Sequence, residues 1–148
     1  LNEEKTQLVS FDKRAYRRGR KSQVFDFLGL TFYWGRSLKG AVIPQVKTSG
    51  KRFRSKLKKI NLWGGKMLNT YPLPVIWGLF CQKLDGHIRY YGVSHNLRAV
   101  QRFRQMARRI LFKHLNRRSQ RKSCNWEQFV RYEKIHPLPK ARICQALF

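Results

Sequence analysis

The hydrophobic pattern of this 148-residue chain changes at Lys47, and that change decides what the chain can fold into. Residues 24–34 read VFDFLGLTFYW, an almost continuous apolar and aromatic run. Such a run predicts a strand buried on both faces, and Gly29 inside it indicates a bulge or a close backbone approach. After Lys47, apolar residues recur instead at the spacing of helices. A small β element followed by helices is therefore expected.

The rest of the first part is predicted to hold short strands and loops. Residues 7–11 fit a short strand, and residues 13–21 form a basic, glycine-containing loop. Residues 35–40 supply turn residues before a second strand at 41–46, which Pro44 places at a sheet edge because proline cannot donate to a neighbouring strand.

Helix start and stop signals divide the second part into four segments. Thr48 or Ser49 can cap the first helix, which Gly64 and Gly65 should end. The second begins near Pro72 or Pro74 and ends at residues 90–92, and the third begins at Asn96 with an apolar stripe running to Leu115. The last helix runs from Trp126 to about Ile135. Asn125 and Gln128 have the spacing of a capping box at its start, and Pro137 stops it.

These elements define an α+β fold that is mainly α. A short β segment at residues 1–46 precedes a bundle of three to four helices at residues 47–148, and we expect these ranges to be two structural units.

The charge of the chain points to a polyanionic partner. Lys and Arg number 33 against 7 Asp and Glu, which gives a net charge of +26. A compact protein with this excess repels itself unless a counter-charge is near, so a nucleic acid is the first candidate, with a solvated charged surface as the alternative. Of the basic residues, twenty lie between 47 and 122 beside a single acid, Asp85. The predicted RNA contacts are Lys51, Arg52, Arg54, Lys58, Arg98, Arg102, Arg108, Arg109, Arg117 and Arg118.

Other chemistry is not indicated. The acids form no pair suited to binding catalytic metal ions, so no catalytic residue is assigned. Cys81, Cys124 and Cys144 lie far apart, and their spacing to the histidines fits no zinc site, so no metal and no cofactor are expected. The longest apolar run, residues 71–81, is too short to span a membrane.

Several strings resemble the bacterial group II intron reverse transcriptase and maturase family. LNEEKT at residues 1–6 is similar to a segment that follows the catalytic palm motif in that family, and FDFLGLTF at 25–32 is similar to its FDFLGF strand. LDGHIRYYG at 84–92 resembles the L-x-G-x-x-x-YYG of the maturase-specific thumb, and RRSQ at 117–120 with Asn125-Trp126 resembles its tail. The resemblance covers nearly the whole chain.

The resemblance implies that this is the C-terminal part of a larger, cytoplasmic bacterial protein encoded by a mobile element. Phe27, Leu28 and Gly29 would correspond to the primer grip, and the helices from Ser49 onward to the thumb, or domain X, which binds intron RNA and aids splicing. The metal-binding Tyr-x-Asp-Asp motif would lie upstream with its Mg²⁺, so this chain alone is predicted to be inactive. In a complete RNA-directed DNA polymerase it would also meet target DNA or an RNA–DNA duplex. The alternative function is an unrelated basic RNA-binding protein, such as a ribosomal component.

Overall fold

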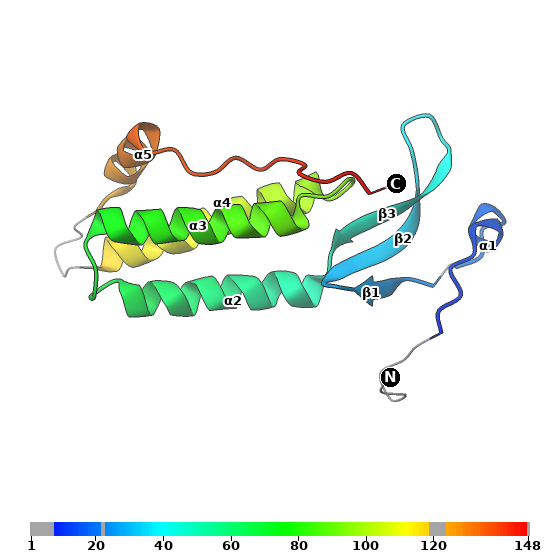
Figure 1. Cartoon of the computed structure of the whole chain (residues 1–148), viewed down its shortest axis with the longest axis horizontal. Helices are drawn as coiled ribbons and strands as arrows, with labels where there is room; N and C mark the ends of the chain where they lie inside the picture. The colour runs from blue at the N-terminus through cyan, green and yellow to red at the C-terminus, as the bar shows by residue number, and fades with distance from the viewer. Residues whose placement is uncertain (1–7, 22, 119–123, 148) are drawn as a thin grey trace.

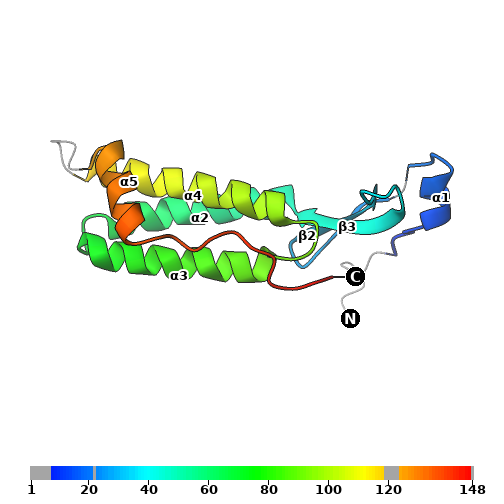
Figure 2. The same ribbon diagram turned by 90° about the horizontal axis from the view of Figure 1, so that it is seen from above.

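The computed structural model describes residues 8–21, 23–118 and 124–147. They form a mixed α+β structure, 54% helical, with five helices and a three-stranded antiparallel sheet. The helices α2, α3 and α4 lie side by side, and the sheet extends from one end of this group (Figures 1 and 2). In chain order the elements are α1 (Lys13–Arg17), β1 (Phe25–Phe27), β2 (Leu30–Arg36), β3 (Val42–Thr48), α2 (Gly50–Met67), α3 (Leu73–Tyr91), α4 (Leu97–Arg117) and α5 (Trp126–Ile135).

The apolar run at residues 24–34 folds as a hairpin, so the prediction of one continuous strand is wrong. The chain reverses at Leu28 and Gly29, whose φ angles are 52° and 81°. Two successive positive φ values produce a tight two-residue turn whose twist matches the flanking strands. Antiparallel β1 and β2 pair from Phe25–Phe32 to Phe27–Leu30.

The second predicted strand is confirmed as β3, which pairs with β2 on one side only. Pro44 lies opposite Trp34 in this edge strand. The predicted strand at residues 7–11 is wrong over 8–11, which have no regular structure, and residue 7 lies outside the described residues. The predicted loop at 13–21 contains the short helix α1, because the Asp12 side chain accepts a hydrogen bond from the backbone N–H of Arg14 at 2.8 Å and so caps it.

Helix α2 begins as predicted and ends later than predicted. Ser49 caps it by accepting a hydrogen bond from the N–H of Arg52 at 3.3 Å. Gly64 and Gly65 do not stop it, because they permit a close approach of α4 instead. A Cβ atom on Gly64 would lie 2.6 Å from Cδ2 of His114, closer than packed atoms can be.

Helices α3, α4 and α5 begin where the capping signals place them. Asn96 precedes α4, but its side chain does not cap the helix and is instead buried. Its Nδ2 donates to Oγ1 of Thr48 at 2.9 Å and to the carbonyl of Tyr91 at 2.8 Å, and its Oδ1 accepts from the N–H of Thr48 at 2.7 Å. Asn96 therefore joins the end of β3 to the end of α3. Asn125 and Gln128 form the predicted capping box.

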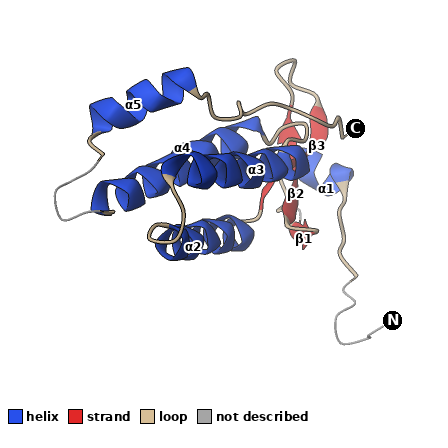
Figure 3. Cartoon of the chain, turned by 60° about the vertical axis from the view of Figure 1, so that its left-hand side comes forward, coloured by secondary structure: helices blue, strands red, loops and turns tan. Residues whose placement is uncertain are grey.

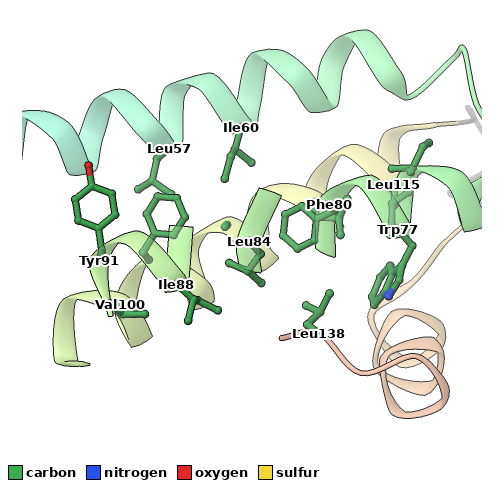
Figure 4. Close-up of a cluster of buried hydrophobic side chains, with 14 of the residues drawn as sticks. Leu57, Ile60, Trp77, Phe80, Leu84, Ile88, Tyr91, Val100, Leu115 and Leu138 are labelled. Carbon is green, nitrogen blue, oxygen red and sulfur yellow. The ribbon is translucent and has the colours of Figure 1, made fainter. Parts of the chain in front are cut away.

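The core lies between the three long helices. Leu57 and Ile60 of α2 point toward α3, where Leu84 and Ile88 are fully buried (Figure 4). Helix α5 packs on the far side of α3 and α4 from α2 (Figure 3). The segment after α5 then runs back along the helices toward the sheet (Figure 2), with Leu138 buried. The predicted division at residue 46 stays a prediction.

Candidate nucleic-acid interface

Most of the described cations have no carboxylate partner. Among the described residues, ion pairs hold three basic side chains: Arg89 and Arg142 pair with Asp85, and Arg108 pairs with Glu133. The other described cations form no ion pair with a carboxylate, and those that also lack an internal hydrogen bond are available to a polyanion.

One group of cations lines a cavity of about 600 Å³ between α2 and α3, here called the α2–α3 cavity. Arg52, Lys56 and Lys59 face it from α2, since residues four and three apart share one side of a helix. Lys83 faces it from α3. Its wall is completed by Leu28, Ile60, Gly86, His87, Tyr90, Tyr91 and Phe103.

The tip of the β1–β2 hairpin closes one end of this cavity. The hydroxyl of Tyr90 donates to the carbonyl of Leu28 at 2.8 Å, and the N–H of Ser49 donates to the carbonyl of Gly29 at 2.9 Å. Tyr91 points its hydroxyl toward the start of α2 (Figure 4), and a Cβ atom on Gly29 would lie 2.9 Å from that oxygen. Glycine is thus required there by both space and conformation.

The hairpin tip is apolar and accessible. The exposed fraction of Phe27 is 59% and that of Leu28 is 66%, and both residues line a smaller hollow with Lys51. Large apolar side chains held in solvent beside cations are typical of a binding surface. The residues predicted as primer-grip-like therefore lie next to predicted RNA contacts.

A second hollow, of about 870 Å³, lies on the opposite side of α2 and is called the α2–α4 groove. It brings together Arg54, Arg98 and Arg102, three of the predicted RNA contacts. The guanidinium of Arg102 lies 5.7 Å from the centre of the Phe53 ring, which holds its side chain against α2. Through Tyr33 and Lys47 the groove continues over the sheet into a hollow that includes Arg20, Lys21 and Arg36.

Other predicted contacts have internal roles or stand apart. Arg108 pairs with Glu133 and lies 4.7 Å from the centre of the Trp126 ring, so it joins α4 to α5. Arg118 donates to the carbonyl of Tyr71 at 2.7 Å. Three further contacts are exposed but are not part of the walls of these hollows: Lys58, Arg109 and Arg117.

The sequence-based choice of contacts missed Lys56, Lys59 and Lys83. The first two share one helical face with Arg52 at i, i+4 and i+7, so a helical-wheel projection would have grouped them. Lys83 comes from another helix, and its place in the same cavity follows only from the packing of α3 against α2.

His87 lies at the wall of the α2–α3 cavity and stacks on Phe103, with ring centres 3.4 Å apart. Burial lowers the pKa of His87 to about 4, and the positive charge of Lys56 adds to this. Its imidazole is therefore neutral at pH 7.

The described residues hold no cluster of His, Cys, Asp or Glu that could bind a metal ion. All three cysteines are free thiols. In the described part of the chain, every helix is too short or too polar to cross a bilayer.

Comparisons of the chain with protein-family models, curated protein sequences and solved structures found no match.

Proposed function

We propose that the chain binds structured RNA as the thumb, or maturase domain, of a group II intron-encoded protein. The observation that carries this proposal is the placement of cations without a carboxylate partner in hollows on both sides of α2. The α2–α3 cavity also holds the exposed side chains of Leu28 and Tyr90, and the α2–α4 groove holds the half-buried rings of Tyr33 and Phe53. Phosphates attract the cations, and unpaired bases can stack on the aromatic rings.

A second observation supports the family part of the proposal. Two of the strings that resemble group II intron proteins, residues 25–32 and 84–92, are far apart in the sequence and meet in space. Their junction is the hydrogen bond from Tyr90 to Leu28 and the close approach of Tyr91 to Gly29. The contact between the two strings holds the hairpin tip against the helices.

The proposed mechanism is stabilisation of folded RNA without chemistry by this chain. Lys and Arg side chains neutralise phosphates that repel one another in the compact intron, while the RNA itself performs the splicing reactions. In a complete RNA-directed DNA polymerase, the hairpin tip and α2 would lie beside the primer, and the upstream palm would supply the acids that bind Mg²⁺. The setting proposed is the bacterial cytoplasm.

The test is a filter-binding titration of the chain with a group II intron RNA, a DNA duplex of equal length and heparin, at several salt concentrations. The proposal predicts tightest binding to the intron RNA, and a salt slope that reports several phosphate contacts. Equal affinity for all three polyanions would refute it, and preferential co-sedimentation with ribosomes would favour the ribosomal alternative.

A further inference from the structure

The α2–α3 cavity has features that a surface for the RNA backbone alone does not need. A row of exposed cations would suffice to track phosphates, yet these cations surround a hollow of about 600 Å³ with apolar and aromatic walls. Cavities of about 300–1,000 Å³ are typical of small-molecule sites. Its dimensions therefore suit a single nucleotide.

We propose that the α2–α3 cavity holds one unstacked nucleotide of the bound RNA, with its base inside and its phosphates on the surrounding cations. This inference rests on the RNA-binding function proposed above and specifies what one of its surfaces recognises. Single-stranded and looped RNA presents unstacked bases that proteins bind on aromatic side chains.

The charges around the cavity suit the phosphate of such a nucleotide. Arg52, Lys56 and Lys59 from α2 face Lys83 from α3, and none of the lining residues is an acid. The nearest carboxylate on α3, Asp85, is bound to Arg89 and Arg142, so it does not compete for these cations. The cavity thus has an uncompensated positive potential.

The inner wall suits the base. Ile60, Phe103 and the buried Tyr91 provide apolar surface, and the ring of Tyr90, which is 53% exposed, offers a face for stacking. Each base stacked on an aromatic ring contributes about 1–3 kcal/mol to binding. The base is thus the part of the ligand that distinguishes this cavity from a simple anion site.

A buried polar atom at this wall is without a partner. His87 is 8% exposed, and no described residue forms a hydrogen bond with its Nε2. Such an atom costs free energy unless a ligand satisfies it, and a neutral imidazole nitrogen can bond to the edge of a base. Because the atom is buried, a base would reach it only after a shift of the neighbouring side chains.

Glycines on α3 provide a clean test. A Cβ atom on Gly86, in the cavity wall, meets no atom within 4 Å, so the G86L substitution fills the cavity without removing a charge. Gly78 on the same helix is equally open and lies outside the cavity wall, so G78L is the matched control. Both substitutions should preserve folding, since leucine favours helices over glycine.

The first measurement is an NMR titration of the full chain, following amide signals of α2 and α3. The probes are the four ribonucleoside 5′-monophosphates, ribose 5-phosphate and inorganic phosphate. We expect at least one nucleotide to bind about fivefold or more tightly than ribose 5-phosphate, because only the base can stack. The G86L chain should lose this preference and G78L should keep it. Equal binding of nucleotides and inorganic phosphate would overturn the proposal and leave an anion site.

The second measurement separates this inference from the proposed function. For intron RNA, G86L should weaken binding by about fivefold to 100-fold, the range expected for one lost stacked base, while the salt slope stays unchanged because every cation remains. Equal RNA affinity of G86L and G78L would overturn the nucleotide site and leave RNA binding standing. Failure of the unaltered chain to bind RNA would instead refute the proposed function, and the mononucleotide titration would still report on the cavity.

Discussion

The arginines of the α2–α4 groove give the sharpest quantitative prediction. The variant R54A/R98A/R102A removes three exposed cations that lie in one groove and form no described ion pair. If each binds one phosphate, the slope of log affinity against log salt should flatten by about 2 to 2.7, at about 0.7–0.9 for each contact. The ratio of the affinity of the unaltered chain to that of the variant should therefore be about 100-fold or more larger at 0.1 M salt than at 1 M salt.

The assay is filter binding of intron RNA from 0.05 to 1 M salt, with helix content followed by circular dichroism. Loss of Arg102 also removes its contact with Phe53, which should cost only about 0.5–1 kcal/mol of stability. The control variant K66A/R131A/K134A removes three exposed cations outside the groove. The reasoning is refuted if both variants lose affinity equally, or if the groove variant shows the same loss at 1 M salt as at 0.1 M.

Three further predictions concern the fold. Gly64→Ala should lower the free energy of unfolding in urea, because its Cβ would lie 2.6 Å from His114. Gly78→Ala should raise it by about 1 kcal/mol, because a Cβ there meets no atom within 4 Å and alanine favours a helix. A Gly64→Ala chain more stable than Gly78→Ala would contradict the close packing of α4 on Gly64. Asn96→Ala should cost about 2 kcal/mol, because it leaves the buried N–H of Thr48 unpaired and removes one of the two hydrogen bonds to the carbonyl of Tyr91; a loss below about 0.5 kcal/mol would argue against this role. Burial lowers the pKa of His87 from 6.5 to about 4, so as the pH falls the unfolded chain binds a proton at this residue before the folded chain does. The free energy of unfolding should therefore decrease by about 3 kcal/mol as the pH falls from 6.5 to 4. A His87→Phe chain with the same pH dependence would contradict this.

Local signals in the sequence predicted the helix starts well and the glycines poorly. Capping depends on residues three positions apart, which is why Asn125 could be identified directly and the cap of α2 could be narrowed to Thr48 or Ser49, of which the structure has Ser49. A glycine, by contrast, can serve a turn, a helix end or a close contact, and distant residues decide which. Gly64 remains helical because His114 packs on it, and Gly29 turns the chain because β2 folds back on β1.

The candidate site shows the same limit. The composition of the sequence identified the basic helices, but it did not show which cations would bind an internal partner. Arg108 is one of six arginines on α4, and only the packing of α5 brings Glu133 to it. Charge identifies a binding surface, whereas pairing decides which of its residues are available.

The two hollows beside α2 depend on one buried junction. Asn96 bonds to Thr48, which lines the α2–α4 groove, and to the backbone of Tyr91, which lines the α2–α3 cavity. Because Ser49, the cap of α2, follows Thr48 directly, these hydrogen bonds help to fix where α2 starts relative to α3 and α4. The hydrogen bonds of Asn96 therefore set the position of the cations in the α2–α3 cavity relative to those in the α2–α4 groove. A substitution at Asn96 should consequently weaken RNA binding through both surfaces at once, although its own side chain contributes no charge.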